Sequence, residues 1–416
     1  MDRDLSQLES LGDLPEPPDA RDDGAVAGMR RGEPDFARAR AALFLAGFAT
    51  FSLLWCTQPL LPAFAVHFGL SAPTSALAQS VTAGAIAGSS MAAAALSQLL
   101  TRRRLMFGAM FIAALLNLAA AVAPGWSTLL LARFLQGVAL GGVPVVAMAY
   151  LAEEIDGRDL ARAVGLYVAG TAFGAMVGRV AVGVIADLFD WQGAMAVVGG
   201  VDLAAAVGFY LLLPISRHFR PSRAFAIAEH LGRWREQFRS PALRRLFAIG
   251  FVLTSVFVVP FNYAGFRLTR PPYLLGQAEI SLIFLTYVFG IASSAQAGNL
   301  TARLGARRAL AASIAVMTLG MTISLAEPLW SFIVGIVFVT MGFFASHAIA
   351  SGEVGRRAGG TKAHAASLYL LFYYAGVTFT GWGAGWFWEH GGWLALTVAT
   401  GIIGTLGVWL SLGQSD

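Results

Sequence analysis

Two arginines and one aspartate stand inside long apolar stretches of the sequence, where a charge is least expected. Arg133 lies about seven residues inside the stretch that begins at Trp126, and Arg179 lies about as far from the end of the next stretch. Asp202 is the carboxylate placed well inside a third stretch. A charge in hydrocarbon costs several kcal/mol unless it faces a partner or water, so these three residues are the first candidates for a functional site.

Asp202 is the best candidate for a proton carrier. Burial favours a protonated acid and a nearby arginine favours a carboxylate, so a group that alternates between these surroundings can bind and release a proton. Counting along the three stretches at 1.5 Å per residue places all three charges roughly 10 to 16 Å below the outer interface. A permanent ion pair between Asp202 and an arginine, with a purely structural role, is the alternative.

The composition is that of a membrane protein. The chain has 416 residues, of which 57% are hydrophobic and 13% charged, and its mean hydropathy is +0.66. Its basic residues are spread through short loops, which indicates contact with a lipid bilayer and excludes a nucleic-acid-binding patch. Cys56 is the single cysteine, so no intrachain disulfide can form, and we interpret it as a packing residue.

The apolar runs predict an all-α integral membrane protein with twelve transmembrane helices, each long enough to cross about 30 Å of hydrocarbon. Residues 1–40 hold ten acids and six arginines, which predicts a disordered tail and does not fit a signal peptide. The predicted spans are 41–64, 77–100, 105–123, 126–150, 161–186, 194–214, 245–268, 278–300, 307–326, 329–351, 363–388 and 393–412.

The basic side chains lie in alternate loops, which predicts the orientation. Because such loops face the cytoplasm, both termini, residues 1–40 and 413–416, are expected to be cytoplasmic. The opposite loops hold only Arg267 and Arg270. The central segment 216–244 is basic and amphipathic, and it is a linker, a membrane-surface helix or a regulatory site. The basic loops are marked by Arg102 to Arg104, Arg158 and Arg162, the arginines from Arg217 to Arg245, Arg303, Arg307 and Arg308, and Arg356, Arg357 and Lys362.

The two halves of the chain resemble each other, which predicts two pseudo-symmetric six-helix bundles over residues 41–215 and 245–412. Two such repeats are typical of a transporter whose substrate site lies between the halves near the bilayer midplane. An offset of 202 residues matches Leu166 with Leu368, Tyr167 with Tyr369, Gly183 with Gly385, Asp187 with Glu389, and Trp191 with Trp393.

Two motifs carry a resemblance to a known family. Leu129, Arg133, Gln136 and Gly137 match the fourth-span motif, and Gly165, Gly174, Gly178 and Gly183 match the fifth-span antiporter motif. On these residues the chain resembles the major facilitator superfamily, in its drug:proton antiporter branch with twelve spans, near the YnfM-type and arabinose-efflux-permease-type members. The glycines are expected to let helices approach closely and slide. Arg179 departs from the motif, because it replaces the expected proline.

A third motif of this family forms a cytoplasmic gate, and it is only partly kept. After the second span its basic end is present at Arg102 and Arg103, whereas the rest of the first copy is lost. The copy after the eighth span keeps more of it, but Ala302 replaces the aspartate that helps to lock the cytoplasmic side. We expect the gate to involve Arg102, Arg103, Gly298, Arg303, Gly305 and Arg307.

Polar and aromatic residues inside other spans are candidates for lining a cavity, although each fits a packing role as well. The tryptophans Trp126, Trp191, Trp330 and Trp393 fall at external span ends, where an interfacial belt explains them. The cavity candidates are Gln58, Gln79, Asn117, Asn262, Tyr263, Tyr287, Gln296, His347, Tyr374 and Trp382.

The leading hypothesis is a monomeric secondary transporter of the bacterial inner membrane that exports a small organic compound in exchange for protons, with Arg133, Gln136, Arg179 and Asp202 at its site. The alternative within transport is a facilitator or proton symporter for a neutral or anionic solute, such as a sugar or organic acid. A membrane enzyme or a sensor is a third possibility. The sequence has no catalytic motif and no cluster of metal ligands, so we expect no enzyme activity, no cofactor and no metal.

Overall fold

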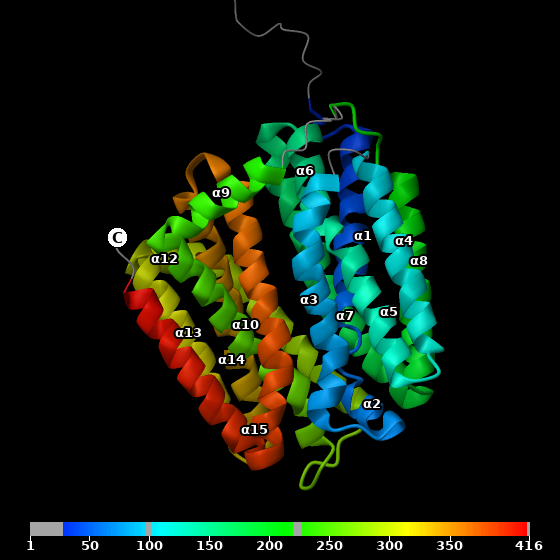
Figure 1. Cartoon of the computed structure of the whole chain (residues 1–416), viewed down its shortest axis with the longest axis vertical. Helices are drawn as coiled ribbons and strands as arrows, with labels where there is room; N and C mark the ends of the chain where they lie inside the picture. Colours follow the sequence, from blue (N-terminus) through cyan, green and yellow to red (C-terminus); the bar gives the residue numbers. More distant parts are fainter. Residues whose placement is uncertain (1–27, 97–100, 219–226, 414–416) are drawn as a thin grey trace, which may run out of the picture.

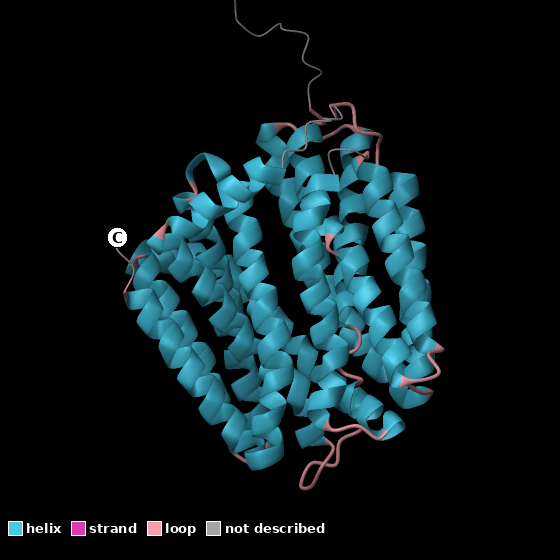
Figure 2. Ribbon diagram, viewed as in Figure 1, coloured by secondary structure: helices cyan, strands magenta, loops and turns pink. Residues whose placement is uncertain are grey.

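The computed structural model describes residues 28–96, 101–218 and 227–413, and these residues form helices joined by loops (Figure 2). Residues 1–27 of the expected tail lie outside this description. The first half comprises α1 (Pro34–Trp55), α2 (Leu61–Phe68), α3 (Ala72–Leu96), α4 (Arg102–Ala121), α5 (Trp126–Leu140), α6 (Gly142–Glu154), α7 (Gly157–Leu188) and α8 (Trp191–Leu212). The second half comprises α9 (Ile227–Arg239), α10 (Pro241–Leu268), α11 (Gln277–Ser281), η2 (Leu282–Thr286), α12 (Tyr287–Leu304), α13 (Ala306–Ile323), α14 (Leu329–Arg357), η3 (Gly359–Thr361) and α15 (Lys362–Leu412).

The predicted twelve crossings are confirmed. Ten helical stretches in the described residues are long and apolar enough to cross a membrane, and two of them run through short breaks, Trp126–Glu154 and Gln277–Leu304. The longest, α15, reverses at Gly392, whose φ of 56° lies in the left-handed region that glycine adopts without strain, so α15 crosses twice. Helix α3 has 25 residues, about 37 Å at 1.5 Å per residue, and supplies the remaining crossing.

The beginning of the first helix differs from the prediction. Helix α1 begins at Pro34 instead of near Ala41, so the last residues of the expected tail are helical. Proline fits the first turn of a helix, because the N–H that it lacks would have no partner there. The residues before α1 are held as well, since the Met29 N–H donates to the Glu154 carbonyl oxygen at 2.8 Å.

The two halves converge at one end of the molecule and diverge at the other (Figure 1). Helix α9, the beginning of α7 and the end of α15 lie toward the diverging end, which we call the basic end (Figure 1). The converging end, called the opposite end below, carries α2, the loop of residues 269–276 and the turn at Gly392. The arginines of the alternate loops therefore collect at the basic end.

Matched glycines make the contacts between the halves. A Cβ at Gly183 of α7 would clash with Ser281 of α11, and a Cβ at Gly385 of α15 would clash with Pro73 of α3. These two glycines are related by the repeat of the sequence, so the same kind of close crossing closes the interface twice. Beside the first crossing, Asp187 Oδ1 accepts a hydrogen bond from the Gln277 backbone N–H at 3.1 Å.

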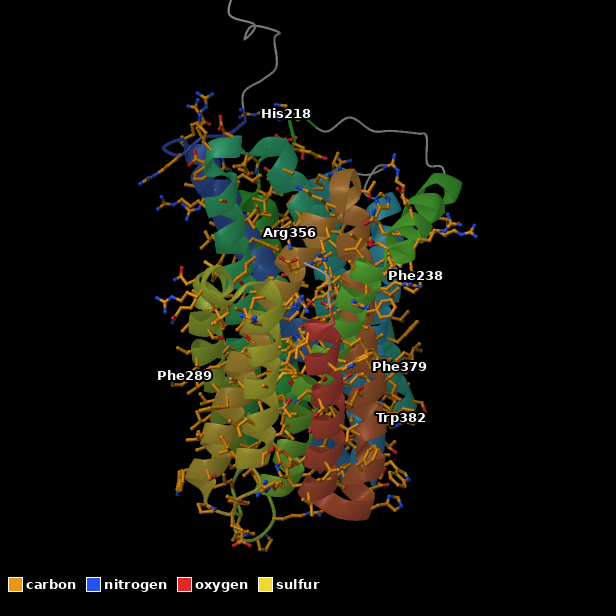
Figure 3. All side chains as sticks on the ribbon, turned by 90° about the vertical axis from the view of Figure 1, so that its left-hand side faces the viewer. His218, Phe238, Phe289, Arg356, Phe379 and Trp382 are labelled. Carbon is orange, nitrogen blue, oxygen red and sulfur yellow. The ribbon has the colours of Figure 1, made fainter. Side chains whose placement is uncertain are left out.

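The outside of the bundle is apolar at mid-height. Phe289, Phe379 and Trp382 are between 49% and 65% exposed and lie along the outer surface, whereas His218 and Arg356 lie nearer the basic end (Figure 3). Exposed aromatic side chains in such a band fit contact with lipid.

The expected belt of tryptophans is wrong for two of its four members. Trp191 and Trp393 are only 5% and 7% exposed, so both lie inside the protein. Trp191 packs edge-on against Phe64 at 5.2 Å, and Trp393 Nε1 donates to Ser324 Oγ at 2.9 Å. Trp330, at 69% exposed, fits the expectation.

Helix α9 packs on the second half. Its Trp234 Nε1 donates to Ser367 Oγ of α15 at 2.9 Å, and Gln237 Nε2 donates to Thr361 Oγ1 at 2.6 Å. The Phe238 ring stacks on Phe372 at 6.1 Å. Of the three interpretations of the central segment, these contacts favour a linker that is fixed to the second half.

Candidate functional site

Helix α7 lies so close to α1 that glycine is required along the contact. A Cβ at Gly174 would clash with the Phe48 backbone, and one at Gly178 would come within 2.7 Å of Ser52 Oγ. Gly170, which the motif did not single out, packs in the same way against the Phe44 backbone. This contact holds Arg179, the residue after Gly178, against the last turn of α1.

The packing motif is only partly kept in space. Gly137 of α5 packs against Thr82 of α3, as the prediction required, but Gly165 has no atom within 4 Å of the position where its Cβ would lie. The expectation that Gly165 is a packing residue is therefore wrong. Gly165 is exposed, whereas Ala163 and Tyr167 beside it are buried, so it lies on the side of α7 that faces away from its neighbours.

The last turn of α1 is the point where the three buried charges meet. Arg133 bonds to the carbonyl oxygens of Leu53 and Leu54, and the Arg179 guanidinium lies 4.5 Å from the Trp55 ring. Asp202 lies beside Ser52. All three charges contact the last turn of α1, which ends at Trp55 and is followed by an irregular turn.

Arg133 supplies the hydrogen bonds that the end of α1 lacks. The last carbonyl groups of a helix have no donor from within the helix, and in a membrane no water replaces it. Arg133 Nη1 donates to Leu53 O at 3.0 Å and Nη2 donates to Leu54 O at 2.9 Å, while Nε faces Ala78 O at 3.4 Å. Nη1 also donates to Gln136 Oε1. Each nitrogen of Arg133 thus has an acceptor, and its charge faces the negative end of the helix dipole.

Gln136 extends this network away from α1. Its Nε2 donates to Ala113 O at 3.1 Å and to Asn117 Oδ1 at 3.3 Å. Asn117 in turn donates to Met195 O at 2.7 Å, and the Cys56 thiol faces Asn117 Oδ1 at 3.4 Å. The predicted cavity residue Asn117 and the single cysteine therefore belong to a buried polar network that joins α1, α4, α5 and α8.

Arg179 has a different environment. It is 1% exposed, and its Nη1 donates to Ala175 O of its own helix at 2.8 Å, whereas Nε and Nη2 have no acceptor in hydrogen-bonding geometry. Three aromatic rings surround the guanidinium group at 4.5 to 5.0 Å, and they come from both halves of the protein. They are Trp55 of α1, Phe284 of η2 and Tyr287 of α12.

Among the described residues, Asp202 has no charged partner, and its polar neighbour is Ser52. It is fully inaccessible to solvent, and neither carboxylate oxygen has a donor in hydrogen-bonding geometry. Among the described residues no ion pair joins it to Arg133 or Arg179, so the structure does not form the permanent ion pair that was the structural alternative.

A short polar chain connects the halves near this turn. Gln58 Nε2, just after α1, donates to Asn262 Oδ1 of α10 at 2.7 Å, and Asn262 Nδ2 donates to Gly381 O of α15 at 3.3 Å. The Tyr263 hydroxyl donates to the same carbonyl at 3.1 Å. Gln277 Nε2 also donates to Pro59 O. These contacts help to close the interface toward the opposite end.

Aromatic side chains of the second half continue from Arg179 toward the basic end. Tyr287 packs against Phe344 at 5.3 Å, and His347 stacks on Phe343 at 5.8 Å. The His347 ring nitrogen Nδ1 lies 2.9 Å from the Tyr369 hydroxyl, so the histidine has the helix-to-helix contact that was its alternative interpretation. Tyr373 lies against both His347 and Tyr374, at 5.1 and 5.2 Å.

Two predicted cavity residues lie elsewhere. Trp382 is 49% exposed and lies on the outer surface (Figure 3), so it does not line a space between the halves. Gln296 lines a pocket of about 380 Å³ whose walls come from α12, α13 and α14 alone. Both residues were selected by their polarity within a span, and that criterion does not say which side of the helix faces the partner half.

The expected gate residues make contacts within their own halves. Arg102 pairs with Glu153 at 2.6 Å, and Arg103 Nε donates to Tyr210 O at 3.0 Å. In the second half, Arg307 bonds to the last carbonyl of α15, and Gly305 ends α12 with a φ of 75°. Gly298 is open on the Cβ side, and Arg303 lines the pocket that contains Gln296. Since the basic end is the diverging end, these residues lie where a gate between the halves would be open.

Of the three rings around Arg179, only Tyr287 was among the cavity candidates predicted from the sequence. Trp55, Phe284 and Ser52 are ordinary members of apolar spans, and only the crossing of α1, α7 and η2 brings them to the charges. The available signal was indirect: a charge at Arg179 in a span without a nearby acid requires some other stabilising group, and aromatic rings are the main alternative.

Comparison with known proteins gives a consistent family. A model of the Major Facilitator Superfamily matches residues 43–294. The uncharacterized MFS-type transporter YybF of Bacillus subtilis is 39% identical over 389 residues, which cover 92% of this chain and 95% of the relative. The inner membrane transport protein YnfM of Escherichia coli is 39% identical over 365 residues, which cover 88% of this chain and 87% of YnfM.

The fold is shared with solved structures at much lower identity. A point mutant of the nucleoside transporter NupG superimposes with a TM-score of 0.77 at 12% identity, over 91% of this chain and 100% of that one. At this identity the comparison concerns the fold alone.

Proposed function

This chain belongs to the Major Facilitator Superfamily, and we propose that it is a proton-coupled secondary transporter that exports a small organic compound by alternating access. Its family membership makes it a multi-pass membrane transporter. The direction of transport, the coupling to protons and the orientation of the termini belong to the proposal. In this proposal the protein works as a monomer in the inner membrane, with the basic end in the cytoplasm.

The broken first helix supports a site near the midplane. Helix α1 ends at Trp55, and the irregular turn that follows carries Gln58 and contacts Asn262 of the second half. Transporters place their substrate sites where helices are interrupted in the middle of the bilayer, between the repeats. Arg179 and its rings lie at this break, with one wall from each half. The conformation described here would be the one that opens toward the cytoplasm.

The single observation that carries proton coupling is the isolation of Asp202. An unpaired carboxylate at full burial is costly, so we expect the group to carry a proton in this conformation. Its neighbour Ser52 lies on the turn that also binds Arg133 and Arg179. A small shift of α7 along α1, over their glycine contact, would change the distance between Asp202 and Arg179 and release the proton.

The proposal is tested by following protons in energised inverted membrane vesicles. Cationic dyes, sugars and organic anions are added in turn, and the collapse of the pH gradient is measured with native protein and with Asp202→Asn. We expect one class of compound to collapse the gradient only with the native protein. If a labelled solute equilibrates but no compound moves protons, the protein is a facilitator and the coupling role of Asp202 is wrong.

A further inference from the structure

The two buried arginines of the first half differ in what their nitrogens bind. Every nitrogen of Arg133 has an acceptor, and Nη1 and Nη2 are held by the carbonyl oxygens of Leu53 and Leu54. Arg179 is as deeply buried, but only one of its nitrogens has an acceptor, and that acceptor belongs to its own helix. A guanidinium group has five N–H donors, and a buried donor without an acceptor is costly. The Arg179 site therefore lacks an anionic partner.

None of the described residues supplies this anionic partner. Asp202 is the carboxylate that the sequence places at a similar depth, but it is not bonded to Arg179. Among the described residues, neither oxygen of Asp202 has a hydrogen-bond donor. The aromatic rings stabilise the positive charge through their faces. The Tyr287 hydroxyl lies close to Arg179, but Nε and Nη2 have no acceptor in hydrogen-bonding geometry. The free edge of Arg179 is thus suited to a group with two acceptor oxygens side by side, which a carboxylate provides.

The surroundings restrict the rest of the ligand. Beside Arg179 the walls are the flat faces of Trp55, Phe284 and Tyr287, and the second half continues with Phe344 and other rings. An inorganic oxyanion has oxygens on all sides and would leave several without donors against these rings. A flat organic body would stack on them instead.

The charge of the site limits the charge of the ligand. Arg133 is the other buried cation at this turn, and its side chain is already bound to α1 and to Gln136. One free guanidinium group compensates one negative charge, so a dianion would keep an uncompensated charge in a buried site.

We propose that the substrate is an organic monoanion with a flat aromatic or conjugated body, whose carboxylate binds Arg179 while its body stacks on the rings of the second half. This inference rests on the proposed transport function, because it names the substrate of the same site. Arg179 replaces the proline expected in the antiporter motif, and the substitution gives the site its charge.

Equilibrium binding to the purified protein in lipid nanodiscs tests the inference without any gradient. The probes are benzoate, its neutral analogue benzamide, and sulfate, and binding is measured by calorimetry. We expect benzoate to bind, and benzamide to bind about tenfold more weakly or worse, because it lacks the charge-assisted hydrogen bonds. Benzamide binding as tightly as benzoate, or sulfate binding in its place, would overturn the inference.

Variants assign the binding to Arg179. We expect Arg179→Gln to weaken benzoate at least about tenfold, and Arg179→Lys to weaken it less, because lysine keeps the charge and loses the planar fork. If the glutamine variant does not fold, the lysine variant alone carries the test. Arg270→Gln, in a pocket at the opposite end, is the matched control and should leave benzoate binding unchanged. Unchanged affinity in both Arg179 variants contradicts the inference.

The binding experiment and the vesicle experiment can fail independently of each other. Benzoate that binds through Arg179 but moves no protons in vesicles would leave this inference standing and refute the coupling. Proton movement driven only by cationic dyes, with no binding of benzoate, would support the coupling and refute this inference.

Discussion

The role of a buried arginine depends on the groups that its nitrogens contact. Arg133 and Arg179 contact the same turn of α1 and are both buried. Arg133 is bound by carbonyl groups of α1, whereas Arg179 faces three aromatic rings and donates only to a carbonyl of its own helix. We therefore assign Arg133 to the stability of the α1 break and Arg179 to the substrate. Replacing Arg133 should mainly lower the stability of the fold, whereas replacing Arg179 should mainly weaken substrate binding.

Replacing each of the two arginines should change the free energy of unfolding by a different amount. Arg133→Met removes the donors from the last turn of α1 and should lower the free energy of unfolding by about 1 to 3 kcal/mol for each buried carbonyl left without a donor. Arg179→Met leaves no buried acceptor unbonded, so its effect should be smaller. The check is thermal unfolding in detergent, followed by tryptophan fluorescence. An Arg179 variant that unfolds at a lower temperature than the Arg133 variant contradicts the assignment.

At the residue scale, the sequence was sufficient to find the charges but insufficient to pair them. Each of Arg133, Arg179 and Asp202 was recognisable because hydrocarbon spans rarely hold a charge. Equal depth in three helices, however, says nothing about the angle at which each side chain leaves its helix. That angle places Ser52 beside Asp202 and Trp55 beside Arg179, so the ion pair that was the structural alternative does not form among the described residues.

At the scale of elements, the contact of α1 with α7 organises the first half. Their backbones come close enough for a Cβ at Gly174 to overlap the Phe48 backbone, and the same applies at Gly170 and Phe44. Such contact allows one helix to slide along the other, which the proposed movement requires.

Alanine at two glycines of α7 tests this contact. Gly174→Ala should lower the free energy of unfolding by about 1 to 3 kcal/mol, as overpacking does, because the Phe48 backbone cannot move aside. Gly165→Ala is the matched control, since the space beside Gly165 is open. The measurement is again thermal unfolding. Equal shifts in the two variants would mean that the close approach of α7 is not required.

The beginning of α7 gives a pH-dependent prediction. Asp156 accepts hydrogen bonds from the Arg158 backbone N–H at 3.0 Å and from Arg30 Nε at 2.9 Å. Both bonds lower the pKa of Asp156 below its usual value, and the bond from the Arg158 backbone has the larger effect. A lowered pKa means that the contact stabilises the fold at neutral pH. The contribution is lost as the pH falls through the lowered pKa, below the range where an aspartate ordinarily titrates.

Hydrogen exchange, corrected for its intrinsic pH dependence, follows this contact at the Arg158 amide. We expect protection at neutral pH in the native protein, its loss only in acid, and its loss at neutral pH in Asp156→Ala. Equal protection of the native protein and the variant at neutral pH would show that Asp156 does not hold the beginning of α7.

Sequence reasoning was most successful for elements. Twelve apolar runs predicted twelve crossings, because a bilayer requires about 20 apolar residues per helix regardless of its neighbours. It was less successful where packing decides: the start of α1 at Pro34, the burial of Trp191 and the docking of α9 through Trp234 depend on contacts made by distant segments.

At the scale of the whole molecule, the repeat makes the closed end symmetric. Gly183 and Gly385 close equivalent crossings, and Asp187 bonds to the first turn of α11 across the first of them. These contacts must break if the protein opens toward the opposite end. Alternating access therefore requires that a covalent link here stops transport.

Paired cysteines test this requirement in a Cys56→Ala background, since Cys56 is the single native cysteine. Cysteines at Asp187 and Gln277, joined by a short bismaleimide, should abolish transport, and cleavage of a reducible equivalent should restore it. Cysteines at Asp35 and Arg217, which lie within one half, should cross-link without effect. Full transport in the cross-linked 187–277 variant would contradict alternating access.

In the proposed mechanism Arg179 binds the substrate and Asp202 carries the proton. The most direct measurement compares net proton-driven transport with one-for-one exchange in proteoliposomes, using the solute that moves protons in vesicles. We predict that Asp202→Asn keeps exchange and loses proton-driven transport, whereas Arg179→Gln loses both. Proton-driven transport that persists in Asp202→Asn would contradict the account.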